Sequence, residues 1–235
     1  MNQNKQKDNI EKGVLKYILM LLIQRIIGIV LFFVAAGTFN DIRGIVNISL
    51  YFIVSIIASV LMLLGHQDTL SERGKKHENT KKWDKILLPL LVLLAYYGIY
   101  FIAGLGNRFQ WNRLPMEYFY VGLVLYLLSS AFIVWPVLEN KHFEETSRIQ
   151  NNREQTVITS GPYRIIRHPG YAGLIIWAIA SYLMFGTFFV GIVSFIIIVI
   201  IWIRTYMEDK MLKTELVGYL EYSQTVKYRL IPLVW

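Results

Sequence analysis

The residues of this sequence that could do chemistry gather in one short segment, Ser160–Tyr171, which reads S-G-P-Y-R-I-I-R-H-P-G-Y. It places two prolines, two arginines, two tyrosines and a histidine between long apolar runs. Each proline removes a backbone donor and disfavours helix at the residue before it. Beside a membrane, irregular charged backbone is tolerated only where protein buries it or where it lines a polar cavity. We therefore expect this segment to form the functional site.

A second candidate group lies in the stretch W-I-R-T-Y-M-E-D-K, where Arg204 and Glu208 are four residues apart. On a continuous helix this spacing puts both side chains on one face. Asp209 is turned roughly 140° from Arg204 by helix geometry, so Glu208 is the expected partner of the arginine. A plain ion pair at the membrane interface is the alternative.

Together these residues offer cations, one carboxylate and aromatic rings. We see no nucleophile–base pair, no metal cluster and no glycine-rich phosphate loop in the sequence. Rings and a carboxylate can hold a sulfonium or amine cation, while an arginine orients an acceptor carboxylate. Pro169 is expected to start a helix whose free N–H groups point back at His168 and Arg167 and attract an anion. The tyrosine-rich tail after Leu216 predicts an amphipathic helix and a lid.

The elements that must position these groups are apolar runs. We interpret six of them as transmembrane helices because most have the length needed to cross about 30 Å of hydrocarbon: Val14–Ala36, Ile45–Leu64, Ile86–Ala103, Met116–Leu138, Tyr171–Gly186 and Thr187–Ile203. The predicted fold is all-α, a polytopic helical membrane protein with a C-terminal cytoplasmic cofactor pocket. Residues 1–140 would form an N-terminal bundle of four spans. Residues 141–235 would form the catalytic region, with Gly186-Thr187 as the turn of a hairpin.

The charge of the chain is +8 over 235 residues, but its distribution argues against nucleic-acid binding. Basic residues cluster before the first run, between the second and third, between the fourth and fifth, and after the sixth. The positive-inside rule then predicts a multi-pass protein with both termini cytoplasmic, and the basic excess suits contact with anionic lipids. Met1–Lys16 is not interpreted as a signal peptide. The absence of cysteine excludes disulfide and thiolate chemistry.

Three further features of the sequence bear on the fold and the site. Arg25, inside the first run, is either functional or an arginine that snorkels or pairs with a carboxylate. His66 and His77 lack the spacing of a zinc site, so no metal is expected. In the polar stretch 138–159, Glu139, Glu144 and Glu145 could form helix-face ion pairs with Arg148, but a plain solvated surface helix is the preferred interpretation.

The motifs G-P-Y-R-x-x-R-H-P-x-Y-x-G (Gly161–Gly173), R-x-x-x-E (Arg204–Glu208) and the Y-x-x-Y…R-L-I-P tail (Tyr219 to Pro232) resemble the isoprenylcysteine carboxyl methyltransferase and phospholipid methyltransferase superfamily. The resemblance covers about the last eighty residues. It implies an integral membrane enzyme that transfers a methyl group from S-adenosylmethionine to a lipid-like acceptor, which enters from the bilayer.

By motif position, the resemblance implies a cofactor-binding set made of Gln155, Thr156, Val157, Ile158, Tyr163, His168, Pro169, Gly170, Tyr171 and Glu208. Arg204 would hold the acceptor carboxylate or orient the reaction, so Arg204 and Glu208 form the implied catalytic pair. Where the superfamily often has a second glutamate after this motif, the chain has Asp209, which weakens any role at that position. Structural roles for His168 and interfacial roles for the two tyrosines are the alternatives.

The leading interpretation is isoprenylcysteine-type carboxyl methylation. The alternative enzyme is an NADPH-dependent membrane reductase of the sterol-reductase kind, whose C-terminal region is similar but tends to carry more basic and cysteine residues. A transporter or scaffold is the non-enzymatic alternative. Against it, polar residues are sparse in the runs, and no pair of broken spans occupies corresponding halves.

Overall fold

The computed structural model describes residues 3–75 and 77–235, and throughout them the regular structure is helical. Five long helices are α1 (Gln3–Ala36), α2 (Ile42–Gly65), α6 (Met116–Glu139), α7 (Pro169–Phe185) and α8 (Phe188–Glu215). A sixth long rod is made of α4 (Asp84–Leu93), the π-helical turn η1 (Leu94–Gly98) and α5 (Ile99–Arg108). The short elements are α3 (Gln67–Arg73), η2 (Asn151–Arg153), η3 (Gly161–Arg164) and α9 (Tyr219–Thr225).

Five of these rods are long and apolar enough to cross a membrane: Ile10–Ala36, Ile42–Gly65, Asp84–Arg108, Met116–Glu139 and Phe188–Glu215. Large apolar side chains cover their outward faces, including Leu22, Val30 and Ile56, as expected where lipid replaces water. The chain is therefore an integral membrane protein with an all-α fold. Helix α7 is apolar but has only 17 residues, so a sixth crossing stays a prediction.

Helix α7 lies between α6 and α8 and packs extensively against both. Two glycines allow the close approach to α6: a Cβ on Gly122 would lie 2.9 Å from the Ala180 carbonyl oxygen, and one on Gly173 would lie 2.8 Å from Ile133. Such small residues let membrane helices approach each other closely. Gly186, at φ +74°, ends α7, and Thr187 caps α8 by accepting from the Val190 N–H. The predicted tight hairpin between these helices is confirmed.

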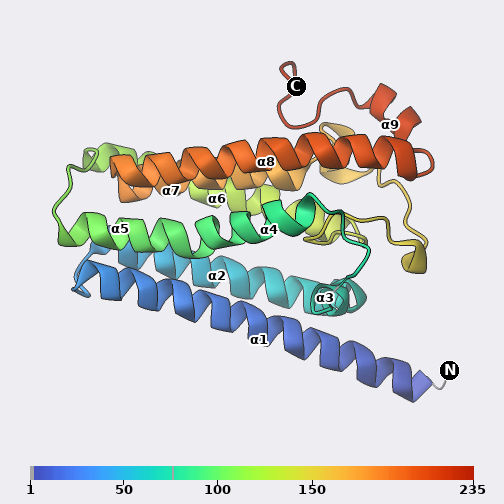
Figure 1. The fold of residues 1–235 in the computed structure, drawn as a ribbon, viewed down its shortest axis with the longest axis horizontal. Helices are drawn as coiled ribbons and strands as arrows, with labels where there is room; N and C mark the ends of the chain where they lie inside the picture. The colour runs from blue at the N-terminus through green and yellow to red at the C-terminus, as the bar shows by residue number, and fades with distance from the viewer. Residues whose placement is uncertain (1–2, 76) are drawn as a thin grey trace.

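The long helices run side by side, and the polar connections lie toward one end of the bundle, with α3, α9 and the start of α1 on the right of Figure 1. The other end carries short turns, tied together where Arg113 pairs with Asp41 at 2.8 Å and bridges Thr187. The candidate site is thus built at the end that holds the long polar loops.

The interpretation of residues 138–159 as a solvated surface helix is wrong. Apart from the last residues of α6 and the turn η2, this stretch is irregular, and several of its polar side chains are buried. Arg148 and Glu144 do pair, at 2.7 Å, with both side chains at most 3% exposed. Contacts to distant helices, such as Ser147 N–H to Asp84 at 2.7 Å, replace the backbone bonds a helix would have made.

Candidate functional site

A cavity of about 360 Å³ opens between the polar loops and extends into the helical bundle. Every residue proposed from the motifs lies on its wall: Gln155, Thr156, Val157, Ile158, Tyr163, His168, Pro169, Gly170, Tyr171, Arg204 and Glu208. These side chains come from the loop before η3, from η3, from the start of α7 and from the end of α8. The fold thus brings residues about fifty positions apart around one space.

Glu208 is the carboxylate of α8 that faces this cavity. Its Oε2 accepts hydrogen bonds from the Tyr171 hydroxyl at 2.7 Å and the Ser147 hydroxyl at 2.9 Å. No cation of the described chain lies within 4.0 Å of it. Glu208 is therefore held in place by neutral donors while its negative charge stays available to a bound cation.

The predicted pairing of Arg204 with Glu208 is wrong. The Arg204 Nε donates to Asp84 Oδ1 at 2.8 Å, and its Nη2 donates to the Glu145 carbonyl oxygen at 2.8 Å. Asp84, at the start of α4, is 0% exposed and also accepts the Ser147 N–H. Helix α4 places the buried carboxylate of Asp84 beside Arg204. The partner of Arg204 is therefore decided by the packing of two helices and not by the four-residue spacing within α8. The guanidinium also lies over the Tyr171 ring, 5.4 Å from its centroid.

The segment before α7 is anchored by Asp209, which the sequence analysis discounted. Its carboxylate binds Arg167 Nε at 2.7 Å, Arg229 Nε at 2.9 Å and Lys213 Nζ at 3.1 Å. Arg167 also donates to the Val226 carbonyl at 2.6 Å. Arg167 is therefore already engaged and is not a free anion-binding group, contrary to the expectation for this helix start. Pro169 does begin α7, as predicted.

The tail completes this anchor. The N–H groups of Arg167 and His168 donate to the carbonyls of Tyr228 and Arg229 at 3.0 and 2.9 Å. The chain then turns back over α8 (Figure 1), where Trp235 stacks on Trp202 with ring centroids 4.2 Å apart. The tail therefore braces the segment Ser160–His168 from outside.

Three buried phenols line the cavity on this side. Burial raises the pKa of Tyr163, Tyr219 and Tyr222 above the ordinary value for tyrosine, because a phenolate would lose its hydration. They stay protonated and donate: Tyr222 to the Tyr163 carbonyl at 2.7 Å and Tyr219 to Asp209 at 3.2 Å. His168 sits beside them, its Nε2 3.4 Å from the Tyr219 oxygen.

His142 is a cavity residue that the sequence analysis missed. Its side chain is buried, yet neither ring nitrogen has a hydrogen-bond partner in the described part of the chain. Burial lowers its pKa, and the charges of Arg153 and Lys141 lower it further. The ring is therefore a neutral imidazole with unused donor and acceptor atoms, which a ligand in the cavity can satisfy.

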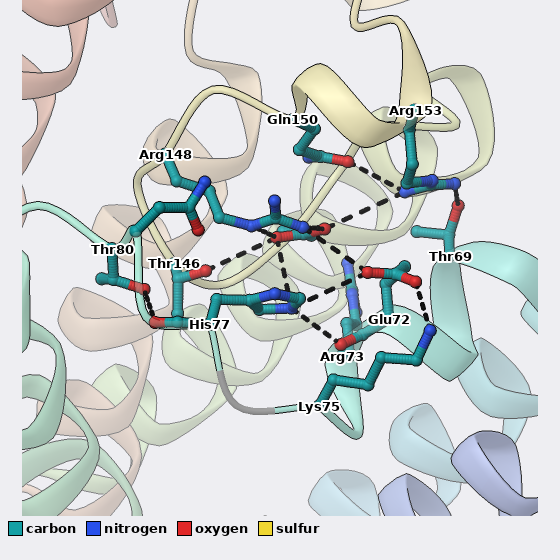
Figure 2. A network of polar contacts seen from close by, with 12 residues as sticks. Thr69, Glu72, Arg73, Lys75, His77, Thr80, Thr146, Arg148, Gln150 and Arg153 are labelled. Atoms are coloured by element: carbon teal, nitrogen blue, oxygen red, sulfur yellow. Dashed lines mark hydrogen bonds and ion pairs between the residues drawn. The ribbon is translucent and has the colours of Figure 1, made fainter.

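An ion-pair network closes the polar end, and Figure 2 shows it joining α3 to the loop that follows α6. Glu72, His77 and Glu144 place potential metal-ligand atoms within 4.8 Å of one another. However, Arg148 approaches both carboxylates, at 2.7 and 3.5 Å, and Lys75 pairs with Glu72 at 2.5 Å. Burial would raise the pKa of Glu72, but the hydrogen bond and charge of Lys75 outweigh it and the pKa is lowered. These charges already neutralise the acids, so we interpret the cluster as a structural tie.

Arg25 lies on the cavity wall deeper in the bundle. It neither snorkels nor pairs with a carboxylate among the described residues, contrary to the simpler alternative. Its Nε donates to Ser55 at 3.0 Å, its Nη1 donates to Gln24 at 3.1 Å and to Tyr51, and the side chain is 8% exposed.

Like His142, the site residues Asp84 and Ser147 were not predicted from the sequence. No short-range spacing in the sequence links them to the motif residues.

A helical membrane protein with a polar, aromatic-lined cavity at the loop end of its bundle is thus the class that the fold defines. Residues 121–214 match the model of the isoprenylcysteine carboxyl methyltransferase (ICMT) family. This range includes the cavity loop, α7 and Glu208. The match confirms the resemblance to the ICMT superfamily seen in the motifs.

Curated relatives agree. A probable protein-S-isoprenylcysteine O-methyltransferase of Oryza sativa subsp. indica is 36% identical over 66 residues, which are 28% of this chain and 35% of that protein. A protein-S-isoprenylcysteine O-methyltransferase of Schizosaccharomyces pombe is 26% identical over 127 residues, 54% of this chain and 46% of that protein. The B enzyme of that name in Arabidopsis thaliana is 26% identical over 147 residues, 60% of this chain and 70% of that protein. The chain spans about a third of the rice protein.

Proposed function

We propose that the chain is an S-adenosylmethionine-dependent methyltransferase that methylates the carboxylate of a membrane-embedded, isoprenylcysteine-type acceptor. The observation that carries the proposal is Glu208, a carboxylate on the cavity wall whose only described partners are two hydroxyls. The family match and the names of the relatives support the methyltransferase class. Dependence on S-adenosylmethionine is our proposal.

The residues around the cavity fit such a donor. Glu208 would hold the cationic end of the molecule, and the Tyr163 and Tyr171 rings would lie against the sulfonium. His142 has ring nitrogens free to bond polar groups of the donor. Gln155–Ile158 would line the remaining wall. When bound, S-adenosylmethionine would supply an electrophilic methyl group to the acceptor carboxylate, with a C–O bond formed, the methyl C–S bond broken and S-adenosylhomocysteine as the leaving group.

A carboxylate acceptor needs no general base, since it is already the nucleophile at neutral pH. The chain must therefore orient the acceptor, exclude water and hold the donor in line. The Arg204 guanidinium lies over the Tyr171 ring, 5.4 Å from its centroid, and the hydrogen bond to Asp84 fixes its direction. We propose that the remaining N–H groups of Arg204 bind the acceptor carboxylate, and that residues 141–235 form the donor end of the cavity and residues 1–140 the acceptor end.

The alternation of basic loops supports cytoplasmic termini, with the donor end of the cavity in the cytoplasm. The NADPH-dependent reductase is the alternative enzyme, and the family match favours the methyltransferase over it.

The test is calorimetric titration of the detergent-purified full chain with S-adenosylhomocysteine, with NADPH titrated in parallel. We expect saturable S-adenosylhomocysteine binding that weakens about 10- to 100-fold in Glu208→Gln, the range for a hydrogen bond to a charged group. Glu215→Gln, on the same helix but outside the cavity, is the matched control and should bind as wild type. Equal affinity in wild type and Glu208→Gln would refute the assignment, and binding of NADPH alone would favour the reductase.

Arg204→Met separates binding from turnover. We expect it to keep S-adenosylhomocysteine affinity within about threefold and to lose methyl transfer by about 100-fold or more, since orientation of the acceptor is lost. Full activity of this variant would contradict the role given to Arg204.

A further inference from the structure

Five residues beside the cavity form a closed ring of contacts: Asp84, Ser147, Tyr171, Arg204 and Glu208. Arg204 Nε donates to Asp84 Oδ1 at 2.8 Å, and Asp84 Oδ2 accepts the Ser147 N–H at 2.7 Å. The Ser147 hydroxyl donates to Glu208 Oε2 at 2.9 Å, and the Tyr171 hydroxyl donates to the same oxygen at 2.7 Å. The Arg204 guanidinium lies over the Tyr171 ring and closes the circuit. Two separate routes therefore join Arg204 to Glu208.

Asp84 is the member of this ring that lies behind the cavity wall. The other four residues line the cavity, whereas Asp84 does not and is 0% exposed. It is the first residue of α4 and stands 120 positions from Arg204 in the sequence. A buried carboxylate is costly unless it is paired and hydrogen-bonded, and Asp84 meets this need with one oxygen on Arg204 and the other on Ser147. It can therefore act on a ligand only through these two residues.

Ser147 relays the position of Asp84 to Glu208. Its N–H is held by Asp84, and its carbonyl oxygen accepts the Lys81 N–H at 3.1 Å. Two backbone bonds to the start of α4 thus fix one residue of a loop that is otherwise irregular. The hydroxyl of this same residue holds Glu208. A displacement of Asp84 therefore moves the donor that orients the carboxylate of Glu208.

Arg204 is attached to the same loop as well as to Asp84. Its Nη2 donates to the carbonyl oxygen of Glu145, two residues before Ser147, at 2.8 Å. An acceptor carboxylate that draws the Arg204 guanidinium toward itself therefore pulls on both groups that position Ser147. The contacts form an unbroken chain from the proposed acceptor-binding arginine to the proposed donor-binding carboxylate.

We propose that Asp84 is a positioning residue that couples the two ligands: an acceptor carboxylate bound at Arg204 orders the ring and thereby tightens binding of the donor at Glu208. The inference rests on the proposed function and names the device that links its two ligands. Such coupling is reciprocal, and it arises because the second ligand binds to side chains that the first has already ordered. In methyl transfer it favours the complex that holds both reactants in line.

The experiment measures this coupling without turnover. S-adenosylhomocysteine is titrated calorimetrically into the detergent-purified full chain, alone and with saturating N-acetyl-S-farnesylcysteine, whose free carboxylate is the group that the arginine would bind. The carboxamide of the same amphiphile is the ligand control. The quantity compared is the ratio of the S-adenosylhomocysteine affinities with and without the amphiphile.

Three variants break or keep the ring. Asp84→Asn removes the shared carboxylate, Asp84→Glu keeps a carboxylate, and Ser147→Ala removes only the hydroxyl that holds the donor-binding glutamate. Because Ser147→Ala leaves the charges of the buried ion pair in place, it tests the ring even where Asp84→Asn does not fold. Arg113→Met is the matched control, since it breaks an ion pair with Asp41 at the far end of the bundle, outside the cavity.

In wild type and Arg113→Met we expect the farnesylcysteine carboxylate to raise the S-adenosylhomocysteine affinity about fivefold or more, and the carboxamide to change it less than about twofold. In Asp84→Asn and Ser147→Ala the ratio should fall below about twofold, and Asp84→Glu should recover part of it. A recovery by the longer carboxylate is not expected of a residue that only fills space.

A ratio of one in wild type would overturn the inference without any variant, as would an unchanged ratio in Ser147→Ala. A purely structural Asp84 would weaken S-adenosylhomocysteine binding in Asp84→Asn with the ratio preserved, and that result also overturns the inference. So does a ratio that falls equally in Arg113→Met, because it would report general loosening of the bundle. Absence of S-adenosylhomocysteine binding in wild type would refute the proposed function and this inference with it, whereas binding without coupling overturns the inference alone.

Discussion

The buried pair of Asp84 and Arg204 lends itself to a quantitative test. Asp84 is 0% exposed and Arg204 is 2% exposed. The carboxylate uses one oxygen for Arg204 Nε and the other for the Ser147 N–H, at 2.8 and 2.7 Å. Asp84→Asn removes the negative charge and replaces one carboxylate oxygen by an NH₂ group, which is a donor. Either the Arg204 guanidinium or the Ser147 N–H then faces this donor instead of an acceptor. Breaking a buried pair in this way costs about 3–5 kcal/mol.

The chain offers a control pair between the same two regions. Lys81, three residues before Asp84, binds Glu215 of α8 at 2.7 Å, but the two side chains are 31% and 42% exposed. An exposed pair contributes at most about 1 kcal/mol. Glu215→Gln should therefore cost at least about 2 kcal/mol less than Asp84→Asn. This difference corresponds to roughly 30-fold in the unfolding equilibrium.

The assay is reversible unfolding in mixed micelles, followed by tryptophan fluorescence and circular dichroism. Double-variant cycles with Arg204→Met then isolate the coupling. The double variant Asp84→Leu/Arg204→Met should regain much of the stability lost in Asp84→Asn, because no buried charge is left unpaired. The reasoning is refuted if Asp84→Asn costs no more than Glu215→Gln, or if Asp84 and Arg204 show no coupling.

Three further predictions concern other parts of the site. Asp209→Asn should release the tail, since Arg167 and Arg229 lose their shared carboxylate. Limited proteolysis after residue 225 should then become at least about tenfold faster. An unchanged cleavage rate would contradict the role of Asp209 as an anchor. Gly173→Ala should destabilise the bundle by about 1–3 kcal/mol, because the added Cβ would collide with α6. Gly65→Ala is the control and should not destabilise it, because a Cβ at Gly65 meets nothing within 4 Å. Unfolding in micelles measures both. The pKa of His142 is lower in the folded chain than in the unfolded chain, so the unfolded chain binds a proton more readily. The contribution of His142 to the free energy of unfolding is therefore complete above the unfolded pKa of about 6.5. It is lost as the pH falls below that value. His142→Leu should flatten that acid-side loss, and an identical pH profile in both proteins would argue against it.

Local rules were enough for the features that depend on neighbouring residues. Pro169 starts α7 because its ring fixes φ at a helical value, and because the backbone N–H that proline lacks would have no partner within the first turn of the helix. Gly186 ends it at a positive φ that few other residues adopt without strain. Apolar run lengths located the long helices, and the order and spacing of the motifs indicated the ICMT superfamily.

The identity of each polar partner was decided only by the tertiary structure. Arg204 takes Asp84, 120 residues away, rather than Glu208 four residues away, because the packing of α4 against α8 puts a buried carboxylate beside it. Asp209 was discounted because it replaces a glutamate, yet its shorter side chain lies among Arg167, Arg229 and Lys213. The irregular loop after α6 is held by such long-range bonds. The prediction of a helix there, which considered only spacing along one helix face, was therefore wrong.

Sequence alone thus located the long apolar helices, the tight turn between α7 and α8 and a set of residues that line the cavity, since run length, proline and glycine act over a few residues. Only the assembled bundle decided which charges neutralise one another and which stay free. Helix spacing constrains directions along one element, but an ion pair depends on the separation of atoms from different elements. For that reason it became visible only in the fold that, among the described residues, Glu208 is held by two hydroxyls and Arg25 by neutral side chains such as Ser55.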